Sequence, residues 1–281
     1  MTHAFVLPFV QVAAAAALVL SGIHAYLGFH VVRRGVLFVD LALAQMAALG
    51  VALAVVLGRE HDPVGSYLLA LGMTFVGAAL FAWMRGRARS VPLEAFIGIV
   101  FATAQAAVFL VLEKSPAGPE HLKETLVGSL YTVDPAHVVK VAALYAAIGA
   151  VHWLLRRPFF EITDDAAAAR ARGRRVFWWD FLFYVTFGVV VTSSVQIAGV
   201  LLVFGYLVIP AVAGLLASPR AGPALAVGWT FGVAASLAGL AASVQWDLPA
   251  APSILVALTA LLAALGAALA LARRVRGTPR A

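Results

Sequence analysis

Long apolar runs, each close to 20 residues, dominate this sequence. A helix needs about 20 apolar residues to cross the hydrocarbon layer of a membrane, because its backbone polar groups must all be satisfied within the segment. We expect nine such helices, at residues 8–30, 36–57, 64–84, 92–112, 137–155, 177–196, 198–217, 224–244 and 253–272. Two of these runs meet at a turn near Gly199, so eight crossings are also possible. The predicted fold class is all-α: a polytopic helical membrane protein with one transmembrane domain over residues 1–281.

The composition excludes several other classes. Charged residues make up 12% of the chain and hydrophobic residues 63%, whereas soluble proteins carry about 25% charged residues. So few charges rule out a soluble enzyme, a disordered protein and a nucleic-acid binder, although the net charge is +7. Cysteine is absent from the sequence, which excludes disulfides and thiolate metal sites.

The basic residues predict the orientation in the membrane. Of the 20 basic residues, 16 fall in alternate connections, and such an excess of Lys and Arg marks the cytoplasmic side. This places the N-terminus outside and the C-terminus in the cytoplasm. The cytoplasmic set comprises Arg33, Arg34, Arg85, Arg87, Arg89, Arg156, Arg157, Arg170, Arg172, Arg174, Arg175, Arg220, Arg273, Arg274, Arg276 and Arg280. The opposite set is Arg59, Lys114, Lys123 and Lys140, and residues 114–138 could hold a re-entrant segment.

The longest cytoplasmic connection, residues 156–176, is predicted to contain a short helix. Acidic residues precede an Ala-rich run and basic residues follow it, in agreement with the helix dipole. The segment is either a solvated connector whose arginines set the topology or a coupling helix on which a soluble partner docks. The docking hypothesis rests on Asp164, Asp165, Ala167, Ala168, Arg172 and Gly173.

No P-loop pattern GxxxxGK[ST] occurs in the sequence. Such a loop is what cradles nucleotide phosphates in the common ATPases. We therefore expect no enzymatic activity in this chain, and ATP hydrolysis, if it drives transport, must belong to a separate subunit.

Polar side chains within the apolar runs are candidates for a pathway, because polar groups are costly in lipid and tend to face the bundle interior. Asp40 appears as the only carboxylate clearly inside a run, and it is either paired with Arg33 or Arg34 or attracts and gates cations. His24 is either a neutral hydrogen-bonding group or a ligand, and His152 is expected at the membrane interface. Serine and threonine are expected to bond the preceding helical carbonyls. The full set is His24, His30, Asp40, Gln45, Thr103, Gln105, His152, Thr192, Ser193, Ser194 and Gln196.

Two extracytoplasmic loops combine carboxylates with imidazoles. Such groups suit divalent cations such as zinc and manganese. Neither spacing closes a coordination shell, so each loop is either simply solvated or part of an electrostatic funnel for cations. The residues are Glu60, His61 and Asp62 in one loop and Glu120, His121 and Glu124 in the other.

Four segments along the chain carry recognisable patterns: GFHVVRRGVLFVDLALAQMAALGVALA, EAFIGIVFATAQAAVFLV, VQIAGVLLVFGYLVIPAVAGLLA and WDLPAAPSILVALTALL. In the first, an apolar helix ends in a basic pair and an Asp-containing helix follows. In this order, the four segments resemble the zinc and manganese permease family of metal-type ABC importers. The third resembles the family's Gly...Leu-Leu...Ile-Pro-Ala signature, and the fourth its Asp-x-Pro-x-x-Pro start of the last helix.

The second helix departs from the family pattern. The family carries Asp, three residues and then His, whereas here Gln45 matches the His position and one residue has been gained. Asp40 and Gln45 are five positions apart, which is about 140° around a regular helix. A single-turn π-bulge between Val39 and Ala47 would bring both onto one face. Without it, only one of the two could line a pathway.

The resemblance implies a permease subunit of an ABC importer with a divalent metal, zinc, manganese or iron, as substrate. It implies a homodimer in a bacterial-type plasma (inner) membrane, a cytoplasmic ATPase that uses ATP, and an extracytoplasmic metal-binding protein. The alternatives are an ATPase-independent ion-coupled carrier, for which we find no convincing internal repeat, or an ABC permease for a non-metal substrate. The candidate pathway residues are Asp40, Gln45, His24, His30, Gln105 and Gln196, of which Asp40 and His24 are the candidate metal ligands.

Overall fold

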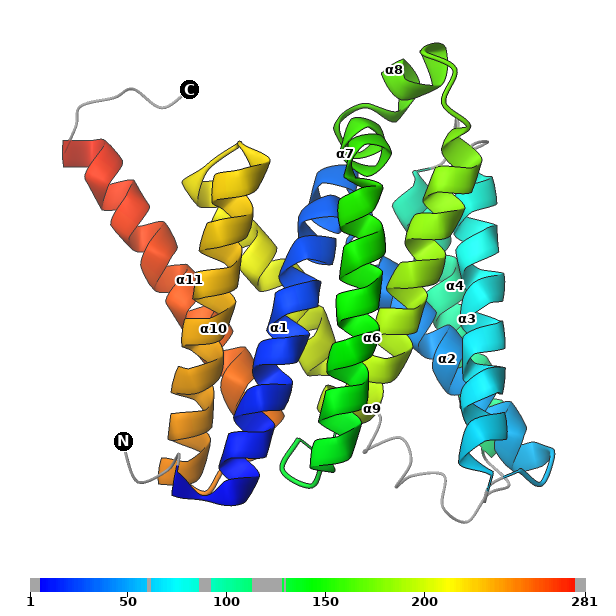
Figure 1. The fold of residues 1–281 in the computed structure, drawn as a ribbon, viewed down its shortest axis with the longest axis horizontal. Coiled ribbons are helices and arrows are strands. Elements are labelled where there is room, and N and C mark those ends of the chain that lie inside the picture. The colour runs from blue at the N-terminus through cyan, green and yellow to red at the C-terminus, as the bar shows by residue number, and fades with distance from the viewer. Residues whose placement is uncertain (1–5, 60–61, 86–91, 113–127, 129, 276–281) are drawn as a thin grey trace. The chain divides into compact units, whose positions relative to one another are not determined.

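Helices are the only regular secondary structure among the residues described by the computed structural model, which are 6–59, 62–85, 92–112, 128 and 130–275 (Figure 1). The helices are α1 (Pro8–Arg34), α2 (Val39–Val56), α3 (Pro63–Arg85), α4 (Leu93–Leu112), α6 (Pro135–Leu154), α7 (Arg156–Asp164), α8 (Ala166–Ala171), α9 (Val176–Ala217), α10 (Ala221–Gln245) and α11 (Ala250–Val275).

Eight of these helices are long and apolar enough to cross a membrane, and α7 and α8 are the short ones. The 42-residue α9 contains both apolar runs that meet near Gly199. At Gly199 the backbone leaves the helical region, with φ 71° and ψ 162°. Glycine tolerates this conformation because it has no Cβ. All nine predicted runs are therefore helical, and two of them lie within α9. The possible re-entrant segment falls mostly outside the described residues.

The chain divides into two compact units. The first unit comprises residues 1–29, 130–138 and 205–281, and the second comprises residues 30–129 and 139–204. Both units include parts of α1, α6 and α9. The single transmembrane domain expected from the sequence stays a prediction.

In the first unit, small residues bring the helices into close contact. A Cβ added to Gly28 of α1 would lie 1.8 Å from the carbonyl oxygen of Leu207 on α9. The hydroxyl of Tyr206 bonds Ser236 of α10 at 2.7 Å. Small residues and hydroxyl pairs of this kind are the usual means by which helices associate in a membrane, where hydrophobic burial supplies little force between them.

In the second unit, α2 packs against α3 and α4. The turn before α2 starts at Gly35, whose φ of 65° ends α1. The N–H of Gly35 donates to Val32 O and that of Val36 to Val31 O, which is the Schellman arrangement. This local ending directs the chain into α2 and places Asp40 in the first turn of that helix.

The α2–α3 contact gives a stability prediction. A Cβ on Gly50 would lie 2.5 Å from Leu69 O and 2.6 Å from Ala70 Cα, so Gly50→Ala must push the two backbones apart. Overpacking of this kind costs about 1–3 kcal/mol. We expect Gly50→Ala to lower the melting temperature of the protein in detergent.

Gly72→Ala on α3 is the matched control, because a Cβ there meets nothing within 4 Å. The Gly72 variant should have the same melting temperature as the wild type. Equal melting temperatures for the two variants would show that α2 and α3 are not in close backbone contact.

Candidate functional site

Asp40 is buried in the first turn of α2, with 1% of its surface exposed. Its Oδ1 has no hydrogen-bond partner among the described residues. The positive end of the α2 dipole favours a carboxylate at this position. The neighbouring arginines form ion pairs elsewhere, Arg33 with Asp164 at 3.2 Å and Arg34 with Asp180 at 2.9 Å. The structure therefore contradicts the interpretation of Asp40 as their partner.

Gln45 is also buried, with 5% exposed. The predicted π-bulge is wrong, because α2 is a regular α-helix from Val39 to Val56. Asp40 and Gln45 therefore diverge by about 140°. Both are nevertheless buried, because the first half of α2 is enclosed on more than one side, with Leu43 and Ala44 buried as well. The helix is thus the regular one that the sequence left as the alternative, in which only one of the two side chains could line a pathway.

His24 belongs to the first unit and is completely buried. Its Nδ1 lies 2.7 Å from Leu20 O. Because a carbonyl oxygen only accepts, Nδ1 carries the proton and donates. Asp40 belongs to the second unit. A shared role of His24 and Asp40 as metal ligands stays a prediction.

The other predicted pathway residues lie in different surroundings. His30 is completely buried and its Nδ1 lies 2.7 Å from Thr163 Oγ1, between the rings of Phe160 and Phe183. Gln105 on α4 is half-buried, and Gln196 on α9 is exposed. His30 thus forms part of a polar cluster at the end of α1, and the structure does not bring it together with these glutamines.

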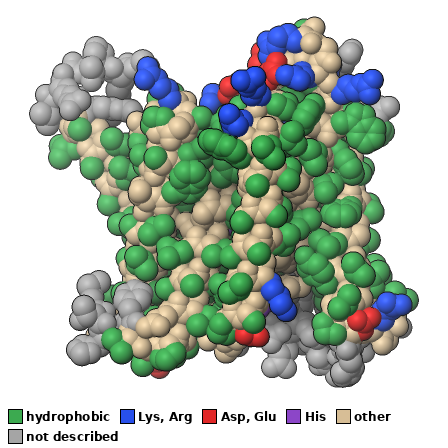
Figure 2. All heavy atoms as spheres, in the orientation of Figure 1, with side chains coloured by type: hydrophobic (Ala, Val, Ile, Leu, Met, Phe, Trp, Pro, Cys, Tyr) green, Lys and Arg blue, Asp and Glu red, His purple; other side chains and the backbone are tan. Residues whose placement is uncertain are grey.

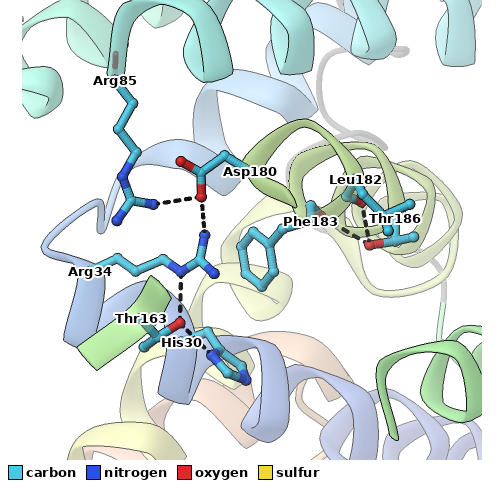
Figure 3. Close-up of polar contacts among 8 residues, drawn as sticks. All are labelled: His30, Arg34, Arg85, Thr163, Asp180, Leu182, Phe183 and Thr186. Atoms are coloured by element: carbon cyan, nitrogen blue, oxygen red, sulfur yellow. Dashed lines mark hydrogen bonds and ion pairs between the residues drawn. The ribbon is translucent and has the colours of Figure 1, made fainter. Parts of the chain in front are cut away.

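That cluster centres on Asp180 of α9, which sequence reasoning missed (Figure 3). Asp180 is 1% exposed, and its Oδ1 accepts from Arg34 Nη1 at 2.9 Å and from Arg85 Nη1 at 3.0 Å. Arg34 also donates from Nε to Thr163 Oγ1 at 2.9 Å, and its guanidinium lies 4.1 Å from the centre of the Phe183 ring. Asp40 is therefore not the only carboxylate within an apolar run.

A signal for this cluster was present in the sequence. Asp180 lies inside the predicted run 177–196, and it follows a pair of tryptophans. A carboxylate within an apolar run is costly, and a cationic partner is the usual means of offsetting that cost. The two arginines that supply it end α1 and α3.

His152 lies in the last turn of α6 and is buried within the protein, with 1% exposed, and its expected position at the membrane interface stays a prediction. Its Nε2 lies 2.8 Å from Thr186 Oγ1, and its ring stacks on Phe159 of α7 at 4.4 Å. The hydroxyl of Thr186 donates back to its own helix, within 3.0 Å of Leu182 O and Phe183 O. His152 therefore fixes the end of α6 against α9 and α7.

The two serine hydroxyls of α9 behave as predicted. Ser193 donates to Val189 O at 2.8 Å and Ser194 to Val190 O at 2.7 Å. They also link helices, because Tyr145 of α6 contacts both serine hydroxyls. Thr192 makes a similar link to Thr74 of α3 at 3.1 Å. These groups are satisfied within the bundle and act as interhelical contacts.

The connection at residues 156–176, expected to be cytoplasmic, forms two helices, α7 and α8, where the sequence predicted one. The predicted helix is α8: Asp165 caps it by accepting from Ala167 N and Ala168 N, both at 2.9 Å. After α8, the N–H of Gly173 donates to Arg170 O at 2.9 Å. Ala167 is exposed, Ala168 half-buried and Ala169 fully buried against Ile162 and Val176.

Charged side chains gather on α7 and α8, while the surface next to them is mostly hydrophobic (Figure 2). Glu161 of α7 accepts from Arg172 Nε at 2.7 Å and Arg174 Nε at 3.0 Å. These two hydrogen bonds hold the pKa of Glu161 below its ordinary value. The contacts join the chain after α8 back to α7, so the two helices form one charged hairpin together with exposed Asp164.

Within the described part of the chain, no group of three or more His, Cys, Asp or Glu side chains is arranged to hold a metal ion. Asp62 forms an exposed ion pair with Arg59 at 3.6 Å. The other residues of the predicted cation funnel lie outside the described residues: Glu60, His61, Glu120, His121 and Glu124.

Over the described residues, eight helices are long and apolar enough to cross a membrane, and a charged hairpin connects α6 with α9 (Figure 1). This is the architecture of a multi-pass membrane protein. Residues 6–268 match the ABC 3 transport family, and the chain belongs to this family. Membership identifies it as a permease subunit of an ABC transporter, and implies an ATPase and a substrate-binding protein as partners.

Relatives of known role include the manganese transport system membrane protein MntC of Halalkalibacterium halodurans, 24% identical and covering 91% of this chain and 85% of the relative. A probable iron transport system membrane protein of Haemophilus influenzae is 26% identical, over 85% of this chain and 86% of the relative. Among solved structures, PsaBC from Streptococcus pneumoniae in complex with a Fab superposes with a TM-score of 0.77 at 21% identity. The superposition covers 94% of this chain and 95% of the other. This last likeness concerns the fold.

The Asp180 cluster predicts a large loss of stability on Asp180→Asn. The change leaves the completely buried side chain of Arg34 without its carboxylate. Breaking one side of a buried ion pair costs about 3–5 kcal/mol. We expect a strongly reduced melting temperature in detergent and a lower yield of inserted protein.

Asp164→Asn is the control, because the Arg33–Asp164 pair is largely solvated, with 34% and 54% of the side chains exposed. An exposed pair contributes less than about 1 kcal/mol. Similar melting temperatures for the Asp180 and Asp164 variants would contradict the buried cluster.

Proposed function

We propose that this chain is the membrane-spanning subunit through which an ABC importer moves a divalent metal ion into the cytoplasm. Two copies form the pathway, a separate cytoplasmic subunit hydrolyses ATP, and an extracytoplasmic protein delivers the ion. The support is family membership over residues 6–268 together with relatives whose names specify manganese and iron transport. The same membership sets aside the ATPase-independent carrier.

Asp40 is the observation that carries the proposal of a cationic substrate. It is a buried carboxylate with no ion-pair partner recorded in the described region. A desolvated carboxylate costs several kcal/mol unless a cation offsets its charge. A passing divalent ion supplies that charge, whereas a fixed arginine would permanently neutralise the site. Asp40 is thus the first residue we assign to the pathway.

Gln45 is the residue that bears on which divalent metal the permease carries. Gln45 stands at the position of the family's histidine, and an amide is a poor ligand for zinc. Manganese and iron(II) accept oxygen ligands more readily. The absence of an imidazole at position 45 therefore fits a manganese or iron permease better than a zinc permease.

The charged hairpin α7–α8 is proposed as the docking site of the ATPase. Its exposed residues include Ala167, Arg170 and Arg172, and the cap at Asp165 keeps α8 helical. The concentration of arginine in this connection supports a cytoplasmic location, with the N-terminus outside and the C-terminus inside. Its neighbour Ala169 packs inward and serves the fold of the hairpin.

Asp40→Asn tests the pathway assignment. The amide keeps the size of the side chain and removes the charge that attracts a cation. We expect uptake of Mn²⁺ and Fe²⁺ into proteoliposomes that contain the whole transporter to fall by at least about tenfold, which corresponds to about 1.4 kcal/mol. The melting temperature should stay the same or rise, because a buried charge without an ion pair has been removed.

Asp134→Asn is the control for this experiment. Asp134 is an exposed carboxylate whose side-chain oxygen accepts from Ala136 N, which an asparagine oxygen also does. The Asp134→Asn variant should take up Mn²⁺ and Fe²⁺ at the wild-type rate. Unchanged metal uptake in the Asp40 variant, or a loss of transport only through misfolding, would remove Asp40 from the pathway.

Ala167→Trp tests the docking surface. A large side chain at this exposed position blocks a protein partner without entering the core of the hairpin. We expect the ATPase to be lost during co-purification while the melting temperature of the permease is unchanged. Gly222→Ala, at an open position of α10, is the control. Full retention of the ATPase by the Trp variant would reject α7–α8 as its docking site.

A further inference from the structure

Thr163, in the last turn of α7, links the charged hairpin to the membrane-spanning helices of the second unit. Its Oγ1 accepts from Arg34 Nε at 2.9 Å and lies 2.7 Å from His30 Nδ1, and both partners belong to α1. Thr163 is 5% exposed, whereas the next residue, Asp164, is exposed. The end of α7 is therefore bound to the end of α1 through a buried hydroxyl.

Arg34 carries this connection onward to α9. Its guanidinium binds Thr163 on one side and Asp180 on the other, with the Phe183 ring beneath it (Figure 3). The side chain of Arg34 is 0% exposed. A buried guanidinium with a fixed planar fork transmits a displacement of one partner to the other, because it cannot turn to water to replace a lost contact.

Two arginines share a single oxygen of Asp180. Arg34 comes from α1 and Arg85 from the last turn of α3, and both donate to Oδ1. One carboxylate therefore faces two cations, and either arginine alone balances its charge. Arg85 is 16% exposed and Arg34 is 0% exposed, so Arg85 is the partner that can exchange Asp180 for water at the lower cost.

We propose that Thr163, Arg34, Asp180 and Arg85 form a coupling relay between the ATPase and the helices of the pathway. Displacement of α7 moves Arg34 through its hydrogen bond with Thr163. Arg34 keeps its ion pair with Asp180, and the ion pair between Arg85 and Asp180 breaks. The release frees the end of α3 from α1 and α9. Since α3 packs against α2, the helix that carries Asp40, the relay reaches the pathway residue. The proposal rests on the proposed docking of the ATPase at α7–α8.

Thr163→Val tests the relay against Thr163→Ser. Valine has nearly the same shape as threonine and lacks the oxygen that accepts from Arg34, whereas serine retains that oxygen. The assay is the whole transporter in proteoliposomes, with Mn²⁺ as the probe and the ratio of Mn²⁺ transported to ATP hydrolysed as the readout. We expect this ratio to fall about fivefold or more in the valine variant, the low end of ordinary coupling effects. The serine variant should behave as the wild type, and both should retain the ATPase.

Arg85→Gln is the second variant and supports the test if Thr163→Val folds poorly. It leaves the completely buried Arg34–Asp180 pair in place and removes only the partner assigned to release. We expect ATP hydrolysis without the binding protein to rise about fivefold or more, because the restraint on α3 is permanently absent. Arg59→Gln, which removes an exposed pair with Asp62, should leave this basal hydrolysis unchanged.

The results separate the relay from the docking assignment. A wild-type transport ratio in Thr163→Val, equal behaviour of the Val and Ser variants, or unchanged basal hydrolysis in Arg85→Gln would each overturn the relay. Loss of the ATPase from a Thr163→Val permease with normal melting would make Thr163 a docking residue and also overturn it. Retention of the ATPase by Ala167→Trp would instead reject the docking site. If the wild-type transporter hydrolyses ATP without moving Mn²⁺, the proposal of a metal substrate fails. The stimulation of ATP hydrolysis by the binding protein then serves as the readout of the relay.

Discussion

The shared oxygen of Asp180 is the constraint on which the end of the second unit next to α7 depends. A carboxylate taken out of water is costly, and its attraction to a cation offsets that cost only when the partner is close and fixed. Arg34 and Arg85 meet this requirement at 2.9 and 3.0 Å. Because they end α1 and α3, the ends of those two helices must converge on the start of α9. The positions of three helices are thus set by one charge.

Asp40 shows the opposite solution to the same problem. It is as buried as Asp180, but its Oδ1 has no hydrogen-bond partner in the portion of the protein that is described. The start of α2 lowers the cost of its charge without neutralising it, since a helix terminus acts as about half an elementary charge. A fixed cation produces a structural joint, and a partial positive potential leaves a place that a mobile cation can occupy. Two chemically identical groups therefore stand in electrostatically different environments, and this difference underlies the proposal that Asp40 belongs to the pathway.

The sequence predicted the helices well because membrane-spanning segments obey a single requirement of length and hydropathy. All nine runs are helical, and the start of α8 follows from the capping chemistry of Asp165. The site was predicted less completely. Asp180 was missed because its partners lie 95 and 146 residues away in the chain, and such pairings depend on tertiary packing. The prediction of a π-bulge was wrong because it assumed that Asp40 and Gln45 must share a face. The helix α2 is enclosed on several sides, so both residues are buried on different faces of a regular helix.

The hairpin also shows why a force applied to α8 would reach the membrane. Alone, the six residues of α8 would be too short to persist as a helix in water. Asp165 caps its start, Ala169 packs on Ile162 and Val176, and Glu161 holds both Arg172 and Arg174. With both ends of α8 tied to α7, the two helices move together. The displacement is then delivered at the last turn of α7, where the buried hydroxyl of Thr163 meets Arg34.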